Sequence, residues 1–330
     1  MSLLAKSSGR WWSAIVALVG MLLALPAVAG TVPFEVWVEQ LRQDARSAGI
    51  GEVTLDTALA GLAPISRVIE LDRRQPEGRF TFEQYNQRVL SESRVERGRQ
   101  LYREHRPLLD RVASDYGVQP RFIVALWGIE SSYGSYDGDF PVIGALATLA
   151  YDGRRASFFR GELLKALQIV ERGDIAVDRM TGSWAGAMGQ CQFMPSSYHA
   201  YAVDYDRDGH RDIWTSLPDI FASIANYLAK AGWNDRYTWG RRVSPPAGLN
   251  GDLVGLERAK SLPEWQALGV RRANGADLPL VALDASLLRT DEGQGPSYLV
   301  YQNFRVLMAW NRSTYFALTV GELADLIERG

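Results

Sequence analysis

The chain has 330 residues, of which 47% are hydrophobic and 22% are charged. This composition is typical of a globular protein that is long enough for a large core and for more than one domain. The formal net charge of −2 offers no reason to expect nucleic acid as a partner. The single cysteine, Cys191, excludes an internal disulfide framework, and three histidines leave little material for a zinc site.

The first 29 residues have the pattern of a signal peptide. Lys6 and Arg10 form a positive region ahead of an apolar run from Trp11 to Leu25, and Ala27-Val28-Ala29 supplies a small-residue cleavage site. An uncleaved membrane anchor is the alternative, but the apolar run is short for a bilayer span. No cysteine lies directly after the run, so a lipid anchor is not expected. The sequence predicts cleavage near Ala29 and an exported, soluble protein without a stable membrane anchor.

Residues 30–105 are predicted to form an N-terminal helical domain. Apolar residues within 34–48 share one helical face, and a second short helix fits residues 55–62. Residues 63–80 contain two prolines and a glycine and are predicted to be a connecting loop.

Thr81 and Gln84 have the spacing of a capping box, which predicts a helix through Leu90. The apolar pattern that follows predicts one longer helix that ends near Gly117.

The stretch from Pro120 to Gly134 carries the strongest chemical signal. Proline suits the first turn of a helix, and an apolar stripe at helical spacing follows it. Glu130 lies on that stripe and near the negative end of the helix dipole. Burial and the dipole both disfavour the charged carboxylate, so its pKa should rise toward the range of a general acid. A carboxylate that reaches solvent or pairs with an arginine or lysine is the alternative.

Other charged residues follow this helix. Asp137 and Asp139 lie in a loop, where either could be a second catalytic carboxylate, although aspartate there more often stabilises turns. Arg154 and Arg155 open a predicted helix to about Glu171. They could contact an anionic substrate group or simply lie at the surface.

The run of small residues from Gly182 to Gly189 permits close backbone approach to a ligand or to a neighbouring helix. Neutral polar and aromatic residues in and after this run suit a carbohydrate; they are Ser183, Trp184, Gln190, Gln192, Ser197 and Tyr198. Cys191 is predicted to be a small buried filler, because no histidine lies nearby in the sequence.

Three alternating aspartates, Asp204, Asp206 and Asp208, precede Gly209 and His210 in the pattern that opens an EF-hand calcium loop. Position 12 should be glutamate but is Thr215. Asp219, at the start of the next predicted helix (218–231), could supply the missing carboxylate. A calcium site and an acidic turn both remain open, and the pattern favours the metal.

The C-terminal third changes character. Residues 243–300 are rich in proline and glycine and contain strand-like runs at 278–288 and 298–301, which predicts a small β or mixed domain. Residues 301–330 return to a helical pattern and are predicted to rejoin the core.

Taken together, these segments resemble the lytic murein transglycosylase B family, which has a lysozyme-like core. The matching stretches are ALWGIESSYG, TGSWAGAMGQCQFMPSSYHAYAVDYDRDGHRDIW, DIFASIANYLAKAGW and NFRVLMAWNRSTYFALTVGELADLI. The resemblance implies a mainly α (α+β) fold: a lysozyme-like helical core at 106–242 with an EF-hand-like calcium loop at 204–219, between the N-terminal helical domain and the small β insertion.

The resemblance also implies residue roles. Glu130 would be the sole catalytic acid and base. Substrate would contact Ser183, Gln192, Tyr227, Asn311, Arg154 and Arg155. Calcium would be held by Asp204, Asp206, Asp208, the carbonyl of His210, and Asp219. Where relatives often have tyrosines near the cleft, this chain has Phe158, Trp310 and Phe316.

The sequence therefore predicts a periplasmic, monomeric lytic transglycosylase that acts on peptidoglycan glycan strands, with structural calcium and no organic cofactor. It would cleave the bond from N-acetylmuramic acid to N-acetylglucosamine and leave a 1,6-anhydro end. Two alternatives stay open: a lysozyme-type hydrolase that uses Asp137 or Asp139, and a non-catalytic wall-binding protein.

Overall fold

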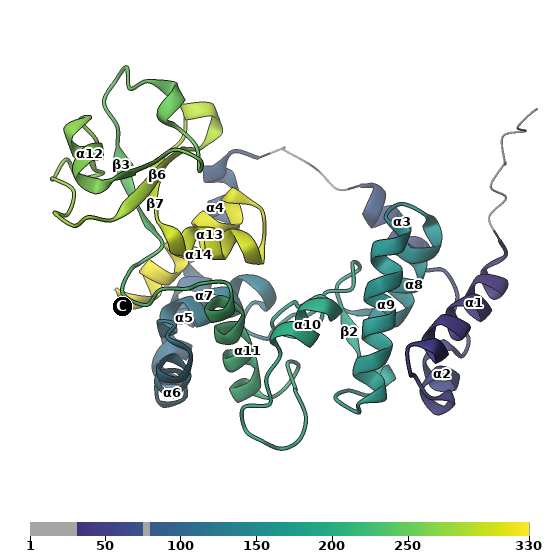
Figure 1. The fold of residues 1–330 in the computed structure, drawn as a ribbon. Coiled ribbons are helices and arrows are strands. Elements are labelled where there is room, and N and C mark those ends of the chain that lie inside the picture. Colours follow the sequence, from purple (N-terminus) through teal and green to yellow (C-terminus); the bar gives the residue numbers. More distant parts are fainter. Residues whose placement is uncertain (1–31, 75–79, 330) are drawn as a thin grey trace, which may run out of the picture. The chain divides into compact units, whose positions relative to one another are not determined.

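The computed structural model describes residues 32–74 and 80–329 (Figure 1). The predicted signal peptide therefore lies outside the described residues. The chain divides into residues 1–33 and residues 34–330, and all helices and strands described below belong to the second unit. Within the described ranges, no helix has the length and hydrophobicity needed to cross a bilayer.

Helices dominate the described residues. The α-helices are α1 (Phe34–Ser47), α2 (Glu52–Leu59), α3 (Ser66–Arg73), α4 (Phe82–Val89), α5 (Glu92–Glu104), α6 (Arg106–Tyr116), α7 (Pro120–Ser131), α8 (Val142–Asp152), α9 (Ala156–Glu171), α10 (Pro195–Tyr201), α11 (Leu217–Lys230), α12 (Leu262–Ala267), α13 (Gln302–Trp310) and α14 (Thr314–Glu328). The strands are β1 (Phe140–Pro141), β2 (Thr181–Gly182), β3 (Gly240–Ser244), β4 (Ala259–Ser261), β5 (Arg271–Arg272), β6 (Asp284–Arg289) and β7 (Ser297–Val300). The prediction of a mainly α-helical fold with a small β region is confirmed.

Two predictions for the N-terminal third are wrong. The segment predicted as a loop contains α3, which packs against α8 and buries Val68. The single long helix after residue 90 is two helices, α5 and α6, because the backbone leaves helical geometry at His105 and Pro107 follows without an N–H to continue the ladder. The capping box of Thr81 and Gln84 at the start of α4 is confirmed.

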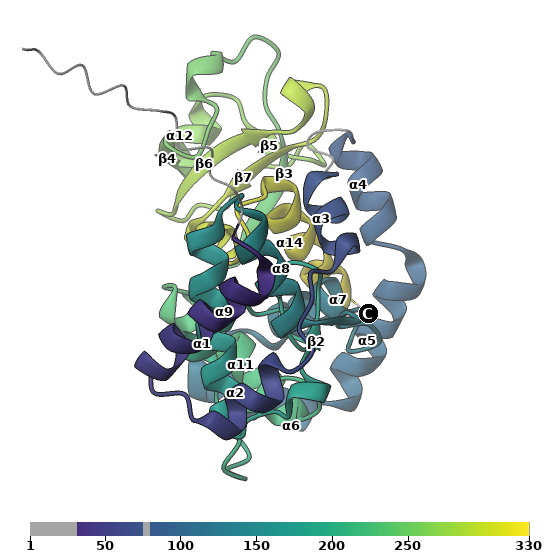
Figure 2. The same cartoon turned by 90° about the vertical axis from the view of Figure 1, so that its right-hand side faces the viewer.

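The helix α7 lies inside the helical part of the unit and packs against α5, α6, α11 and α14 (Figures 1 and 2). Residues 122–128 are all buried, which is typical of a helix that is apolar on every side. Gly128 allows this packing, because a Cβ atom there would lie 2.5 Å from the ring of Tyr133. The residues at its C-terminal end are therefore held by several neighbouring helices.

The strands β3–β7 form one antiparallel sheet in the order β4-β6-β7-β3-β5. Some of its buried side chains, including Leu287 and Leu299, form a second, smaller core with Trp265 of α12. Others, Leu288, Tyr298 and Val300, belong to the large helical core. The strand predicted at 278–288 is shorter, because β6 begins only at Asp284, and β3 starts ahead of the predicted boundary at residue 243. The proposed domain boundaries remain predictions. Figure 2 shows the sheet beside α14, and Tyr298 of β7 donates a hydrogen bond to Glu322 of that helix.

Candidate active site

Glu130 lies in the last turn of α7, just before Ser132 takes a left-handed conformation (φ 51°) that ends the helix. The residue keeps partial exposure. Burial of its carboxyl group raises the pKa to about 7, and a hydrogen bond from Trp310 acts in the opposite direction. In that bond the indole Nε1 donates to Oε1 over 2.6 Å. The expected rise in pKa is confirmed, and at neutral pH the carboxyl group can both give and accept a proton.

Among the described residues, no second carboxylate is among the groups that shift the pKa of Glu130. The loop aspartates make other contacts. The carbonyl of Asp137 accepts a hydrogen bond from Gln192 (2.7 Å), and Asp139 accepts one from the hydroxyl of Tyr136 (3.3 Å). Burial raises the pKa of Asp137 above its ordinary value. Glu130 therefore titrates without a partner acid of its own.

An aromatic group surrounds the Trp310 indole. Its ring centroid lies 4.6 Å from that of Tyr227 and 5.3 Å from that of Phe193. The hydroxyl of Tyr227 donates to the carbonyl of Ala309 (2.7 Å), which ties α11 to α13. The structure thus brings Tyr227, through Trp310, next to the Glu130 carboxyl. Aromatic faces with polar edges of this kind suit sugar rings.

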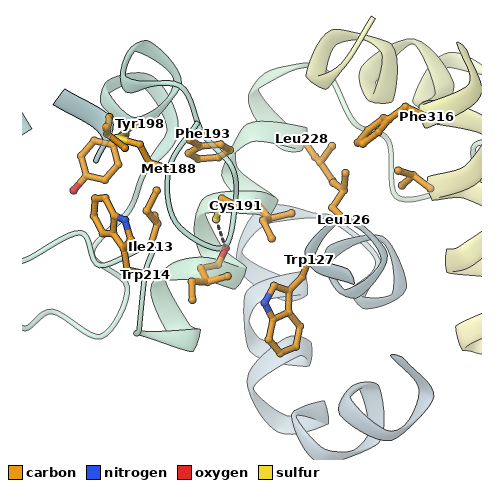
Figure 3. Close-up of a cluster of buried hydrophobic side chains, with 14 of the residues drawn as sticks. Leu126, Trp127, Met188, Cys191, Phe193, Tyr198, Ile213, Trp214, Leu228 and Phe316 are labelled. Carbon is orange, nitrogen blue, oxygen red and sulfur yellow. Dashed lines mark hydrogen bonds between the residues drawn. The ribbon is translucent and has the colours of Figure 1, made fainter. Parts of the chain in front are cut away.

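The other two aromatic departures from the family pattern lie in different surroundings. Phe316 is buried in the core beside Leu126 and Leu228 (Figure 3), whereas Phe158 is 49% exposed. Of the three, Trp310 is the one whose side chain contacts Glu130.

Ser183 and Gln192 belong to the segment that follows β2, and the side chains of both form hydrogen bonds within the protein. The Ser183 hydroxyl accepts from the amide of Ala187 (3.0 Å). Gln192 adopts φ 49°, and its Nε2 also donates to the carbonyl of Gly189. The predicted close approach is to the protein's own segments, since a Cβ at Gly182 would lie 2.1 Å from the Ala187 carbonyl oxygen. Their contact with substrate remains a prediction.

Gln190 and Tyr198 were predicted to contact a carbohydrate, and that prediction is wrong for both. Tyr198 is fully buried and donates to the carbonyl of Arg211, so it offers no surface to a ligand. Gln190 is a structural bridge: its Oε1 accepts from the indole of Trp127 (2.7 Å), and its Nε2 donates to the carbonyl of Trp214 (2.6 Å). The bridge fixes this segment to α7. Cys191 is fully buried, as predicted, with its thiol directed at the carbonyl of Ile220 (Figure 3).

Arg154 and Arg155 are organised by a residue that the sequence did not single out. Asp72 of α3 is buried, and its carboxylate accepts from Nε and Nη2 of Arg154 (2.8 and 2.6 Å) and from Nη2 of Arg155 (3.4 Å). The hydrogen bond from Arg154 is the main cause that lowers the pKa of Asp72. Both arginine side chains remain about half exposed, at 55% and 51%. The pair is thus held in place, and its contact with substrate stays a prediction.

Asn311 directly follows Trp310 at the end of α13. Its Oδ1 accepts from the amide of Ser313 (3.0 Å), so the side chain shapes the turn into α14. Tyr85 of α4 was missed by sequence reasoning. Burial raises the pKa of its hydroxyl, and the charge of Glu130 raises it further. No local pattern marks Tyr85, because its position depends on how α4 packs.

The acidic loop brings together part of the predicted ligand set. Carboxylate oxygens of Asp204, Asp206 and Asp219 lie within 4.8 Å of one another. The carboxylate of Asp208 instead accepts from the amide of His210 (2.9 Å). Three converging carboxylates are the hard oxygen donors that Ca²⁺ prefers, so the residues present fit that ion.

Comparison with known proteins places this geometry in a family. Residues 33–325 match the family model described as Transglycosylase SLT domain. The chain is 34% identical over 257 residues to membrane-bound lytic murein transglycosylase B of Escherichia coli (strain K12), covering 74% of this chain and 66% of that protein.

Solved structures agree. SltB3 from Pseudomonas aeruginosa in complex with NAG-anhNAM-pentapeptide aligns with a TM-score of 0.87 and 44% identity, covering 90% of this chain and 80% of that one. The Escherichia coli lytic transglycosylase Slt35 in complex with calcium aligns with a TM-score of 0.75 and 30% identity, covering 90% and 93%. The chain therefore belongs to the Transglycosylase SLT domain family and, within it, to the enzymes that resemble lytic murein transglycosylase B.

Proposed function

We propose that this protein is a peptidoglycan lytic transglycosylase in which Glu130 serves first as the acid and then as the base. The observation that carries the proposal is the buried carboxyl with a pKa of about 7 and an indole donor at 2.6 Å. Two-carboxylate glycosidases place the second group about 5–10 Å from the first. A carboxylate at the near end of that range would raise the Glu130 pKa by repulsion, and no such contribution is found among the described residues.

The reaction needs one proton donor that later becomes an acceptor. Protonated Glu130 delivers its proton to the oxygen that links N-acetylmuramic acid to N-acetylglucosamine, and the bond from C1 to that oxygen breaks. The Glu130 carboxylate then takes the proton of the muramoyl C6 hydroxyl as O6 bonds to C1. The product has a 1,6-anhydro end, water is not consumed, and the enzyme returns to its protonated form.

Glycan strands would lie along the aromatic group of Trp310 and Tyr227. Ser183, Gln192 and Asn311 are proposed to line this path. Arg154 and Arg155 are proposed to contact anionic groups of the substrate.

The acidic loop is proposed to bind calcium. Asp204, Asp206 and Asp219 would hold Ca²⁺, with Asp208 and the carbonyl of His210 completing the predicted set. The ion would stiffen the loop ahead of α11. We further propose that the protein acts in the periplasm as a monomer.

Replacing Glu130 by glutamine tests the chemistry. Glu130→Gln keeps an acceptor for the Trp310 indole but neither gives nor takes a proton. Digestion of murein should fall by about a hundred- to ten-thousand-fold, while murein binding persists. Asp137→Asn and Asp139→Asn are the matched controls, because each removes one loop carboxylate, and both should be much milder.

Mass spectrometry of the products separates the alternatives. An anhydro end is lighter than a hydrolysed end by one water. If wild-type digests contain only hydrated ends, the protein is a hydrolase, and one of the loop aspartates should then prove essential. If no variant, including the wild type, releases soluble fragments, the protein only binds the wall.

A further inference from the structure

A pocket of about 550 Å³ lies between the β-sheet and the C-terminal end of α14. None of the residues discussed for the Glu130 site lines it. The charged residues that line the pocket are four arginines and two acids: Arg241, Arg242, Arg272, Arg329, Glu322 and Asp325. The pocket therefore carries an excess of positive charge in a protein whose formal net charge is −2.

Three of these arginines are available to a ligand. Arg242, Arg272 and Arg329 are exposed, and within the described residues their guanidinium groups form no hydrogen bond or ion pair. Arg241 differs, because its Nε donates to the hydroxyl of Tyr301 (2.5 Å). Free guanidinium groups that line one concave surface form bidentate hydrogen bonds with carboxylates.

The acidic groups at this pocket have definite partners. Glu322 accepts hydrogen bonds from Tyr298 and Asn86, both at 2.5 Å. Asp325 accepts one from the indole of Trp239 at its Oδ2 (3.3 Å), and its Oδ1 accepts none from the described residues. A ligand that fits must place its anionic groups at the arginines and a donor toward Asp325.

The type of ligand follows from these groups. A phosphate ion carries one or two O–H donors at neutral pH, and its charged oxygens would meet the two carboxylates unfavourably. A sugar would need an exposed aromatic face, but Trp239 and Tyr298 are each only 1% exposed. A short peptide offers both carboxylates and N–H donors.

We propose that this pocket binds a short peptide through its free carboxylates, separately from the Glu130 site. The inference rests on the proposed function for the source of that peptide, the stem peptide of the wall polymer. Such a site would hold peptide-bearing strands on the enzyme independently of cleavage.

Binding of a free synthetic stem pentapeptide, measured by calorimetry, tests the proposal. The double variant Arg242→Ala/Arg272→Ala should weaken binding by about tenfold or more. Arg236→Ala/Arg258→Ala is the matched control, because it removes two exposed arginines outside the pocket, and its affinity should match the wild type. The same peptide with amidated carboxylates should bind the wild type at least tenfold more weakly. Circular dichroism checks that each variant is folded.

Three results would overturn the proposal: peptide binding that the pocket variant leaves unchanged, an equal loss in the control, or inorganic phosphate that competes more tightly than the peptide. Digestion of peptide-free glycan strands is measured in parallel and should be unchanged in the pocket variant. If the wild type forms no anhydro products, the proposed function is wrong. If Arg242→Ala/Arg272→Ala binds the peptide as tightly as the wild type does, only this inference is wrong.

Discussion

Trp310 sets the chemistry of Glu130 at the scale of single residues. Burial of the carboxyl group raises its pKa, and the indole N–H stabilises the charged form and limits that rise. The two effects together leave a pKa of about 7. An acid that must also act as a base needs such a value near the working pH.

Trp310→Phe should raise the pKa of Glu130, because it removes the hydrogen bond that favours the carboxylate. The alkaline limb of kcat/KM, where the acid is lost, should move up by about one pH unit. A pH profile of murein digestion measures this shift. Trp233→Phe is the control, since its indole donates to Gln119 and not to Glu130. If the alkaline limb of the pH profile is the same in Trp310→Phe as in the wild type, the hydrogen bond does not affect the pKa of Glu130.

The raised pKa of Glu130 should also lower the free energy of unfolding at high pH. Below its unfolded pKa of 4.5, the carboxyl group is protonated in both states. As the pH rises toward 7, the unfolded chain releases the proton while the folded protein keeps it, so stability falls. The cost is complete above pH 7 and amounts to at most about 3 kcal/mol.

Glu130→Gln should therefore be more stable than the wild type at pH 8, and by much less at pH 5. Urea unfolding at the two pH values measures the difference. Glu257→Gln on the exposed surface controls for the loss of one charge. An equal effect of Glu130→Gln at both pH values would rule out a buried, proton-retaining carboxyl.

At the scale of elements, α7 and the acidic loop reach their shapes differently. The helix is specified locally by Pro120 and its apolar run, and then fixed by Gln190 bridging Trp127 to Trp214. The loop instead depends on buried Asp219 of α11, whose carboxylate accepts hydrogen bonds from the amides of Tyr205 (2.7 Å) and Asp212 (2.8 Å). An ion bound by the loop would therefore also tie it to α11.

Calcium should raise the melting temperature, because an ion that binds only the folded state stabilises it by mass action. At a hundred times the dissociation constant the gain is about 2.7 kcal/mol, or roughly 5 °C or more. Asp206→Ala should abolish the rise, and Asp252→Ala, an exposed acid outside the loop, should not. Identical melting of the wild type with calcium and with chelator would argue for a plain acidic turn.

At the scale of the whole molecule, the chain combines a large helical core with a smaller core under the sheet. The sheet meets the helices where Tyr298 and Trp239, both of which belong to the larger core, contact α14. The arginine pocket lies at this junction, so its lining comes from β3, β5, β7 and α14 together.

Export remains a prediction for the intact chain. The mature protein should begin at Gly30, because the small residues at 27–29 fit a signal peptidase site. Sequencing the N-terminus of the exported protein measures this. Material that begins at Met1 in the membrane fraction would contradict cleavage.

Local patterns in the sequence were sufficient for several features. The apolar spacing around Glu130 predicted its burial and the direction of its pKa shift, and Thr81 with Gln84 predicted a helix start. The alternating aspartates predicted a cluster of oxygen ligands, two of which do converge. These features depend on neighbours within a few turns of the chain, which side-chain periodicity and capping chemistry encode directly.

Other features exist only after distant segments pack together. Trp310 lies 180 positions beyond the carboxylate that it contacts, and Asp72 lies 82 positions ahead of Arg154. The helix α3 has an amphipathic pattern of its own, but it has only eight residues and lies between prolines, so the segment was predicted to be a loop. Its packing on α8 is what buries Val68. One carboxylate oxygen of Asp208 accepts from the amide of His210, a contact that the spacing rule did not predict, and the role of Asp208 as a calcium ligand stays a prediction. Which side chains meet across such separations is decided by how the helices and the sheet pack, since spacing along the chain specifies only the face that each residue occupies.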